Sequence, residues 1–549
     1  MSRFDQEPPQ WALRFLRFYC KPRALEIIEG DAYELFYKRI ETEGLKTARK
    51  SFSWDVLKFF RWKYIKGLED INSLNNISMF KNYVKISFRS LLKQRFYSLI
   101  NIGGLAIGLA SCLLIVMYIT HELSYDKFHD DADRIHRIGY WTPARLAIQA
   151  KLDLPEIEET TRIQGPFSQT FNIDGKIFKE PMGFNADSTF QNIFTIEFIE
   201  GNPSESLKEP NNIILTQSLA TKFFGYEPAL DKIIKVDGET LKISGVVADP
   251  PKNTHFNYNY INSLPHESWV TVGNWTGNNF FTYAKLTNGS DPMAVQDKMT
   301  EFAAKYVGPE LVKFTGHANY DDYLAEGGRA RTFPLKPMTD LHLYHPAYSL
   351  RSGGSIDNVY IFSAVALFIL VIACINFMNL STARSEKRAK EVGIRKTLGS
   401  LRKQLISQFY IESFLYSILA FGLSLLLLFV LLPWFNNVSG KAISAPWQGP
   451  EFWMLTSTFV LMTSLLSGSY PAFYLSSFKP IKALKGALSG GKKASIPRKI
   501  LVVFQFTISI ALIIGTITVN NQIQTAKERP IGYSPKGMLS IRPASPDLI

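Results

Sequence analysis

The chain has 549 residues, more than one domain usually holds, and a formal net charge of +13. Its charge is segregated, because residues 1–95 carry 19 Lys and Arg against 11 Asp and Glu, whereas residues 120–355 carry 22 against 30. A nucleic-acid-binding protein gathers basic residues on one polar face. Here, the excess of basic residues outside these two regions lies beside long apolar runs. The pattern argues against nucleic acid as a partner and favours a membrane protein.

Residues 1–80 are polar and basic and are expected to form a small helical domain on the cytoplasmic side of a membrane. Two segments in this region, WALRFLRFYC and FSWDVLKFFRW, space their aromatic residues as helices do. Such helices fit either a small hydrophobic core or a membrane surface, and the sequence leaves both open. Residues 81–119 are expected to be an amphipathic lead-in and a first transmembrane helix that acts as an uncleaved signal anchor.

Five apolar runs are long enough to cross a bilayer, because about 20 apolar residues span its hydrocarbon core as a helix. These runs lie at about 96–119, 359–381, 413–433, 452–475 and 500–519. The first contains Gly104 and Gly108, four residues apart, a spacing that can let two membrane helices pack closely. The sequence therefore predicts an α-helical integral membrane protein with about five transmembrane helices.

The Lys and Arg content of the short loops predicts the orientation of these helices. Loop 382–404 holds eight and loop 476–499 holds seven, whereas loop 434–451 holds only Lys441. The two basic loops and the N-terminus are therefore expected in the cytoplasm, and residues 120–358 on the outer side of the inner (plasma) membrane. The tryptophans agree, because they gather where an outer interfacial belt would lie, at Trp434, Trp447 and Trp453.

Residues 120–358 are predicted to form a large extracytoplasmic α/β domain. The segment KIIKVDGETLKISGVVADP alternates β-branched residues around Asp237-Gly238, which indicates a hairpin. NNIILTQSLATKFFG is typical of a strand that leads into a helix ended by Gly225. DPMAVQDKMTEFAAKYV has helical apolar spacing, with Asp291 as its cap and Pro292 in its first turn.

Histidines and aspartates gather after the first span, as ligands of a metal ion can. They are His121, Asp126, His129, Asp130, Asp131, Asp133 and His136. No HExxH motif accompanies them, and a polar amphipathic segment is expected after a membrane exit, so we interpret them as a solvated face. His342 and His345 in DLHLYH are expected in a strand and form no site. We therefore expect no metal, no catalytic residue and no enzyme, but a binding or force-transmitting domain.

The cytoplasmic segments contain no GxxxxGK[ST] phosphate loop. SGGKKAS at 489–495 is only superficially similar, because it lacks the preceding apolar strand. We interpret residues 486–499 as a flexible basic linker. The chain is therefore expected to hold no cofactor of its own, and any ATP that it uses would be bound and hydrolysed by another chain.

The basic segment RAKEVGIRKTLGSLRKQL, residues 388–405, separates the second and third spans. Good helix formers run from Ser385 to Phe414, and breaks are expected at Gly393 and Gly399. Apolar contacts would come from Val392, Ile394, Leu398, Leu401 and Leu405. A membrane anchor would need only the charge, whereas a short helix docked into a partner would also need turns. The glycines favour the docked helix, although both interpretations stay open on the residues alone.

Here the sequence resembles a family. EVGIRKTLGSLRKQLISQFYIESFL closely resembles the signature of FtsX-like, MacB-type ABC transporter permeases. SYPAFYLSSFKPIKALKG resembles the end of the family's fourth span, with Pro471, Pro480 and Leu484 in their usual places, and PRKILVVFQFTISIALIIGTI resembles the start of its second half. ELSYDKFHDDADRIHRI and GVVADPPKNTHFNYNYINS resemble its extracytoplasmic domain, and EIIEGDAYELFYKRIETEGLKTAR resembles a prefix domain of some members.

The resemblance implies a permease subunit that dimerises with itself or another permease half and recruits a separate ABC-type ATPase subunit. ATP hydrolysis there would move a coupling helix at 384–404 and, through it, the extracytoplasmic domain, for export or extraction of a periplasmic substrate. A periplasmic adaptor is a further implied partner. The matching coupling positions are Glu391, Gly393, Ile394, Arg395, Lys396, Leu398 and Gly399. The same motifs also fit a regulatory module that controls an outside enzyme or senses antimicrobial stress without transport.

The end of the chain departs from the family pattern. Residues 359–485 match one permease domain, 500–519 would be a fifth span, and 520–549 resemble the opening of a second outside domain. Relatives with a second half continue further. We therefore expect a truncated or split gene product.

Overall fold

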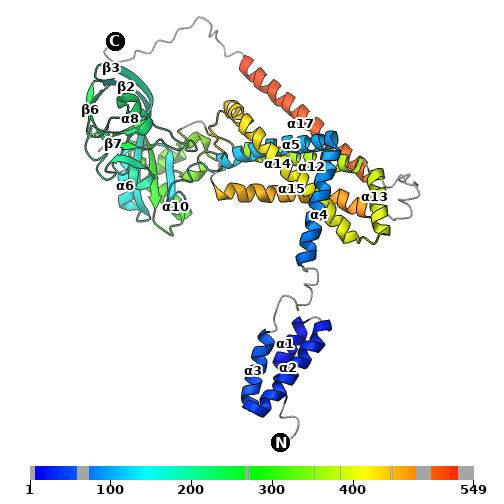
Figure 1. Ribbon diagram of the computed structural model, residues 1–549. Coiled ribbons are helices and arrows are strands. Elements are labelled where there is room, and N and C mark those ends of the chain that lie inside the picture. The colour runs from blue at the N-terminus through cyan, green and yellow to red at the C-terminus, as the bar shows by residue number, and fades with distance from the viewer. Residues whose placement is uncertain are drawn as a thin grey trace.

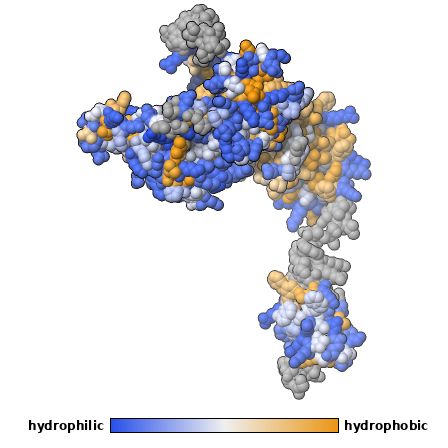
Figure 2. Space-filling model, turned by 90° about the vertical axis from the view of Figure 1, so that its left-hand side faces the viewer, coloured by the Kyte–Doolittle hydropathy of each residue, from blue (hydrophilic) through white to orange (hydrophobic). Residues whose placement is uncertain are grey.

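The structure is a computed structural model that describes residues 7–20, 22–58, 73–265, 267, 270, 273–350, 353–383, 385–445, 447, 449–477 and 496–529. Its elements form an N-terminal helical unit, a bundle of long helices and an α/β domain at one end of that bundle (Figure 1). Figure 2 shows the α/β domain and the N-terminal unit as mostly hydrophilic, and much of the bundle surface as hydrophobic.

The N-terminal unit has a small hydrophobic core. It consists of α1 (Gln10–Tyr19), α2 (Pro22–Glu43) and α3 (Leu45–Lys58). Leu16, Phe36 and Phe52 are buried where the three helices meet, while Trp11 and Trp54 are exposed on the unit's surface. The sequence left open whether these helices form a small hydrophobic core or lie on a membrane surface. The structure contains the core, and it also leaves aromatic side chains exposed on the surface.

Five helices in the described part of the chain are long and apolar enough to cross a membrane, and they contain the five predicted runs. They are α5 (Arg95–Leu123), α12 (Ile356–Ala383), α14 (Arg402–Ser439), α15 (Pro450–Ser476) and α17 (Ile496–Glu528). The bundle is preceded by α4 (Ser73–Lys93), which packs on α14 and α5. Helix α5 packs on both α12 and α14, and α14 packs on α15.

The two spaced glycines of α5 face α12 closely. A Cβ atom added to Gly108 would lie 2.5 Å from the Cβ of Ala373, and one added to Gly104 would lie 3.1 Å from Nδ2 of Asn376. Backbones that approach so closely need residues without side chains. The predicted packing face is therefore present, and its partner is α12.

The described residues of the α/β domain form one mixed sheet of ten strands, nine of which follow the order β10-β1-β9-β2-β3-β8-β5-β7-β4. Its strands are β1 (Ile135–Thr142), β2 (Ile157–Ile173), β3 (Lys176–Ala186), β4 (Phe198–Gly201), β5 (Asn212–Thr216), β6 (Ile233–Val236), β7 (Glu239–Val247), β8 (Tyr260–Ser263), β9 (Phe280–Leu286) and β10 (Leu335–Pro337). Strand β6 pairs with both β2 and β7 and so closes part of the sheet into a small barrel. The barrel is filled by residues such as Phe171, Ile213 and Tyr260.

Short helices cover the sheet and connect its strands. They are α6 (Ala144–Asp153), α7 (Phe190–Ile193), α8 (Gln217–Phe224), α10 (Pro292–Thr315), α11 (Tyr320–Ala325), and the 3₁₀ turns η3 (Met338–Asp340) and η4 (Pro346–Tyr348). One core lies under α7 between β2, β8 and β9, and a second lies under α6 and α10.

The local predictions for this domain are confirmed. Asp237 and Gly238 both have positive φ in the turn between β6 and β7, as a tight hairpin requires. Gly225 ends α8 with φ 66°, and its N–H donates to the carbonyl of Thr221. The Asp291 side chain caps α10, which begins at Pro292.

The strand expected at DLHLYH is wrong. Strand β10 ends at Pro337, and the chain turns through η3 instead. The carbonyl of Asp340 accepts the N–H groups of Tyr344 and His345 at 2.9 and 3.2 Å, so these backbone groups are satisfied within the turn.

Candidate functional site

The basic segment between α12 and α14 folds as two helices joined by a tight turn. Helix α13 (Ser385–Thr397) lies at the end of the bundle opposite the α/β domain (Figure 1). Gly399 has φ +94°, its N–H donates to the carbonyl of Lys396, and the N–H of Ser400 donates to the carbonyl of Arg395. This pair of bonds is the Schellman motif, which satisfies the last carbonyls of a helix and needs glycine at the left-handed position. Helix α14 then begins at Arg402.

The break expected at Gly393 is wrong, and the segment 384–404 is not a single helix. Gly393 lies inside α13 and is buried, and within the described residues of this segment only Gly399 has a left-handed backbone. A glycine costs a helix about 1 kcal/mol relative to alanine but does not end it. We interpret Gly393 as a buried packing position, while Gly399 sets the turn.

The apolar residues of this segment divide into two groups. Val392 and Leu405 are 3% exposed and pack against α14 and α15 in a cluster with Leu475. The other group is exposed, with Ile394 at 44%, Leu398 at 81% and Leu401 at 65%. We call these three residues the apolar ridge. Val392 and Leu405 hold the turn to the bundle, whereas the apolar ridge is exposed and faces away from the bundle.

Two charged residues of α13, Arg395 and Lys396, contact the bundle. Arg395 pairs with Glu391 at 2.6 Å and also donates to the side-chain oxygen of Gln408 in α14. Lys396 Nζ donates to the carbonyl of Ser476 at 2.7 Å, at the last residue of α15. A cation beside the C-terminal carbonyls of a helix is favourable because the helix dipole is negative there. Helix α13 is therefore fastened to both α14 and α15.

The second predicted motif is described only in part. Pro471 lies buried inside α15, where its ring cannot donate a backbone hydrogen bond. Pro480 and Leu484 lie outside the described residues, as do residues 486–495 of the predicted linker. The prediction that the linker extends to residue 499 is wrong for its last four residues, because α17 already begins at Ile496.

The histidine and aspartate segment after α5 is not a uniformly solvated face, so that expectation is wrong for three of its members. Asp126 is 0% exposed, His129 is 5% and His136 is 2%. The Asp126 carboxylate accepts hydrogen bonds from the hydroxyl of Thr254 and the N–H of His255, at 2.9 and 3.0 Å. These contacts come from a loop more than a hundred residues away, so the residues next to Asp126 in the sequence give no sign of its burial.

Burial shifts the proton equilibria of this segment. Desolvation lowers the pKa of His129 to about 4, and Asp126 and Asp130 offset only part of that effect. Its Nδ1 accepts the backbone N–H of Thr195 at 3.1 Å, so the ring is held in its neutral form. Desolvation would raise the pKa of Asp126, but the adjacent His255 and the hydrogen bonds to its carboxylate lower it overall.

Asp126, His255 and Tyr283 form a line of polar side chains in contact that superficially resembles a catalytic relay. His255 Nδ1 lies 2.9 Å from Oδ1 of Asp126, and its Nε2 lies 2.7 Å from the hydroxyl of Tyr283. All three side chains are fully buried, so no substrate can reach them. No group of three metal-ligating residues with suitable geometry occurs in the described residues either. We interpret this line as structural.

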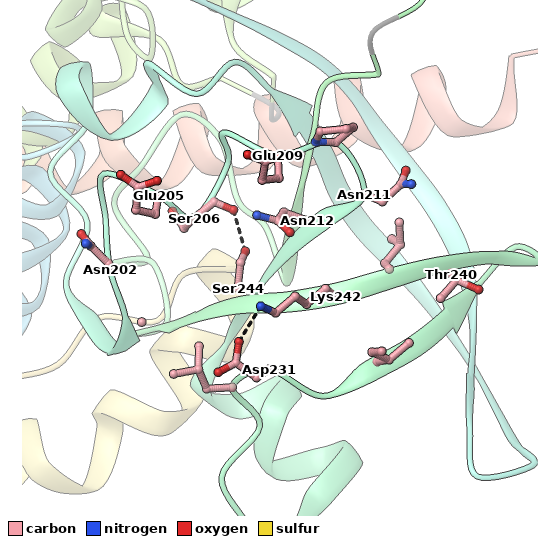
Figure 3. Close-up of a pocket in the computed structure, with 15 residues that line it drawn as sticks. Asn202, Glu205, Ser206, Glu209, Asn211, Asn212, Asp231, Thr240, Lys242 and Ser244 are labelled. Atoms are coloured by element: carbon pink, nitrogen blue, oxygen red, sulfur yellow. Dashed lines mark hydrogen bonds and ion pairs between the residues drawn. The ribbon is translucent and has the colours of Figure 1, made fainter.

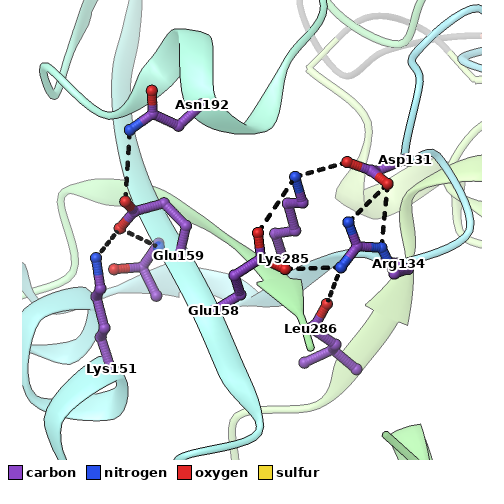
Figure 4. Close-up of polar contacts among 9 residues, drawn as sticks. Asp131, Arg134, Lys151, Glu158, Glu159, Asn192, Lys285 and Leu286 are labelled. Atoms are coloured by element: carbon purple, nitrogen blue, oxygen red, sulfur yellow. Dashed lines mark hydrogen bonds and ion pairs between the residues drawn. The ribbon is translucent and has the colours of Figure 1, made fainter. Parts of the chain in front are cut away.

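Asp131, a partly exposed member of the segment, makes surface ion pairs (Figure 4). Asp131 pairs with Arg134 at 2.6 Å and with Lys285 of β9 at 2.6 Å, and Arg134 also reaches Glu158 of β2 at 2.7 Å. Single exposed pairs contribute little, but a network fixes geometry better than its separate pairs do. These contacts hold the chain that leaves α5 to two strands of the sheet.

The domain also has a solvent-open cavity of about 550 Å³ beside β4, β5 and β7 (Figure 3). Polar side chains such as Asn202, Glu205 and Asn212 line it. Its lysine, Lys242, is already paired with Asp231 at 2.8 Å. No motif in the sequence indicates this cavity, and its lining has no convergent set of groups that defines a ligand.

Two family models match the chain. The MacB-like periplasmic core domain matches residues 98–302, and the FtsX-like permease C-terminal domain matches residues 363–480. The first match includes α5 and most of the α/β domain, and the second includes α12 to α15 with the α13 turn.

Several curated proteins are similar to the chain. MacB of Pasteurella multocida, a macrolide export ATP-binding/permease protein, is 26% identical over 48% of this chain and 36% of its own length. MacB of Bdellovibrio bacteriovorus is 31% identical over 22% of this chain and 18% of its own length. The ABC transporter permease YvrN of Bacillus subtilis is 19% identical over 73% of this chain and 99% of its own length. The chain thus spans about a third or less of the MacB proteins it matches.

Solved structures with a similar domain include the periplasmic region of MacB from Actinobacillus actinomycetemcomitans, with 14% identity, a TM-score of 0.25, and coverage of 36% of this chain and 94% of that one. The extracellular domain of YknZ from Gram-positive bacteria has 13% identity and a TM-score of 0.24, and covers 34% and 97%. With the two family matches and the apolar helices, the chain is a multi-pass membrane protein that belongs to the MacB-type, FtsX-like family of ABC transporter permeases.

Proposed function

We propose that this chain is the permease subunit of an ABC transporter in which a separate nucleotide-binding subunit hydrolyses ATP. The observation that carries the proposal is the apolar ridge of Ile394, Leu398 and Leu401, exposed on a turn that is otherwise basic. An exposed apolar group with a polar rim is typical of a protein interface. A partner chain is invoked because this sequence contains no phosphate-loop motif of its own.

The contacts of α13 support a mechanical role. A force applied to the ridge would reach α14 and α15 through the buried Val392 and through the hydrogen bond from Lys396 to the end of α15. It would pass along the packed helices α14, α5 and α12 to the α/β domain. Movement of that domain would then export or extract a substrate on the outer side of the membrane.

The orientation in this proposal follows from charge. The basic turn and the N-terminal unit would face the cytoplasm, and the acidic α/β domain would face the outer side of the inner membrane. A second permease half, identical or different, would complete the membrane part, and a periplasmic adaptor would contact the α/β domain. The substrate of the MacB relatives, a macrolide by their names, is a candidate for this chain only within this proposal.

The decisive experiment co-expresses the full chain with ABC-type ATPase subunits encoded in the same genome and purifies the complex from detergent. We expect one ATPase to be retained, and Leu398→Asp to reduce its retention at least about tenfold, because a buried charge at an interface costs more than about 1.4 kcal/mol. Ile177→Asp is the matched control, since Ile177 is equally apolar and 72% exposed but lies on the α/β domain. Retention of no ATPase by the wild-type chain would overturn the proposal.

Orientation has its own test. Cysteines introduced at Leu401 and Ile233, both exposed, would be treated with a membrane-impermeant maleimide on spheroplasts. The three native cysteines are buried. We expect Ile233→Cys to react and Leu401→Cys to react only after lysis, and the reverse pattern contradicts the proposed topology.

A further inference from the structure

A cluster of polar side chains, largely shielded from solvent, lies where α5 leaves the bundle and the chain enters the α/β domain. Glu122, in the last turn of α5, is 2% exposed, and His342 is 1% exposed. Lys441, just after α14, has a side chain that is 19% exposed. The two carboxylate oxygens of Glu122 divide between these partners, with Oε1 2.5 Å from Lys441 Nζ and Oε2 3.0 Å from His342 Nε2. We call the three residues the Glu122 cluster.

The Glu122 cluster joins three separate parts of the chain. Glu122 belongs to α5, His342 lies in the turn that leads from β10 toward α12, and Lys441 begins the connection between α14 and α15. Gly354, just before α12, closes the space, because a Cβ there would lie 2.6 Å from Glu122 Oε2 and 2.8 Å from His342 Nε2. One carboxylate therefore meets the ends of α5, α12 and α14.

An aromatic ring seals the cluster. The ring of Tyr125 stacks on that of His342 with centroids 3.4 Å apart and planes within 2°. Lys441 Nζ lies 5.3 Å from the centroid of the same ring and 3.3 Å from its hydroxyl oxygen. Burial acts to lower the pKa of Lys441, but the hydrogen bonds and charges of Glu122 and Tyr125 raise it overall, so the ammonium keeps its charge.

The residues that follow carry the connection into the centre of the sheet. Asp126 binds His255, which reaches Tyr283 of β9, and Arg137 of β1 donates to the hydroxyl of Tyr283 at 3.2 Å. Arg137 also donates to the carbonyl of Tyr348, in the turn that precedes α12. The exit of α5 and the entry to α12 are thus held to the same two strands by fully buried polar groups.

Buried charges are costly, and apolar residues of similar volume often stabilise a protein as well or better. A buried ion pair fixes a specific geometry, because movement of one helix end relative to the other would leave a buried charge without its partner. Apolar helix contacts, in contrast, are preserved when one surface slides over another. The cluster is therefore suited to a junction that must not slip.

We propose that the Glu122 cluster is a rigid joint that fixes the α/β domain to the ends of α5, α12 and α14, so that movement of the bundle is passed to the domain without loss. The transmission step rests on the proposed function, whereas the rigidity of the joint does not. Glu122, His342 and Lys441 are positioning residues in this role.

The test uses the full chain in lipid nanodiscs with spin labels at Ile177→Cys on the α/β domain and Phe96→Cys at the start of α5, at the far end of the bundle and outside the apolar ridge, both exposed positions. Glu122→Gln keeps the shape of the side chain and removes its charge. We expect it to broaden the distribution of distances between the labels while hydrogen exchange in β9 stays unchanged. Lys441→Gln should broaden it similarly, and the double variant no further, because the two side chains act as one pair.

The matched control breaks a different, partly buried pair inside the domain. Asp187 binds Arg162, whose side chain is 7% exposed, through two of its nitrogens at 2.8 and 2.9 Å. Asp187→Asn should speed hydrogen exchange in the domain and lower its melting temperature by roughly 10 °C, with the label distances unchanged. The proposed joint would be overturned if neither Glu122→Gln nor Lys441→Gln broadened the distribution of label distances. It would also be overturned if Asp187→Asn broadened that distribution equally.

A second measurement separates the joint from the proposed function. With the ATPase partner bound, we expect Glu122→Gln to recruit it as the wild type does but to lose the ATP-dependent change in label distance. If the wild type recruits no ATPase, the proposed function fails while the nucleotide-free distances still decide the joint. If Glu122→Gln keeps the full ATP-dependent change, the cluster does not transmit movement.

Discussion

The two ends of the helix bundle are built in opposite ways. At the α/β domain, the ends of α5, α12 and α14 meet in polar contacts centred on the buried Glu122, whose carboxylate pairs with His342 and Lys441 of the same chain. At the other end, α13 is fastened to α14 and α15 but exposes Leu398 at 81% and Leu401 at 65%. The first end is closed and specific, whereas the second presents apolar surface outward.

This difference separates internal from external contacts. A domain that is permanently attached can use buried ion pairs, because both partners are always present. A surface that binds and releases another chain has that chain's groups as partners only while the two are bound. Exposed apolar groups and solvated basic groups suit such a surface better than buried charges, which would lose their partners on release. Under the proposed function, the α13 end would meet a separate partner, whereas the domain end is closed by contacts within this chain.

The largest expected effect tests the open end. Leu405→Ala should destabilise the bundle by about 2–5 kcal/mol, because it empties a packed site beside Val392 and Leu475. Leu398→Ala on the same turn should change stability by less than about 0.5 kcal/mol, because its side chain is exposed. Thermal unfolding of the two purified variants measures the difference. Equal losses would mean that the apolar ridge is part of the internal core.

The next largest effect is the pH dependence of the stability of the α/β domain, at the closed end of the bundle. Burial lowers the pKa of His129 from 6.5 to about 4, so between these values the unfolded chain binds a proton that the folded domain does not. The stabilisation is fully present above pH 6.5 and should be lost as the pH falls to about 4, by about 3 kcal/mol. Hydrogen exchange of the Tyr283 amide, corrected for its intrinsic rate, would follow this loss.

The control for that prediction is His129→Asn, whose side-chain oxygen can still accept the N–H of Thr195. It should be less dependent on pH between 6.5 and 4 than the wild type. The Asp126 carboxylate also loses its stabilising contribution on acidification, but only below its ordinary pKa of 3.8. An identical pH profile in the variant and the wild type would contradict the assignment to His129.

The smallest effect tests the helices that connect the two ends. Gly108→Ala would place a methyl group 2.5 Å from Ala373 and should cost about 1–3 kcal/mol through overpacking. Ala373→Gly in the same chain should restore part of that loss. Gly103→Ala is the control, because nothing lies within 4 Å of its added Cβ. Unfolding in a detergent titration, followed by circular dichroism, would rank the three variants.

Local signals predicted much of the fold. The five apolar runs, the hairpin at Asp237-Gly238 and the cap at Asp291 depend on neighbouring residues, and each occurs as predicted. Two predictions made without knowledge of the tertiary contacts were wrong. The sequence placed Asp126 on a solvated face, but Thr254 and His255 bury it. It placed a break at Gly393 as well as Gly399, but a left-handed turn forms only at the second.

The Glu122 cluster had almost no sequence signal. Lys441 stood out only as the single basic residue of loop 434–451, and Glu122 and His342 lie 220 residues apart. Apolar length, loop charge and turn chemistry act over a few residues, so the sequence alone determined which segments are membrane helices, which turns are tight, and which side is basic. Ion-pair partners and burial depend on segments that meet only after folding, so only the tertiary structure decided which charges hold the domain to the bundle and which apolar residues remain for a partner.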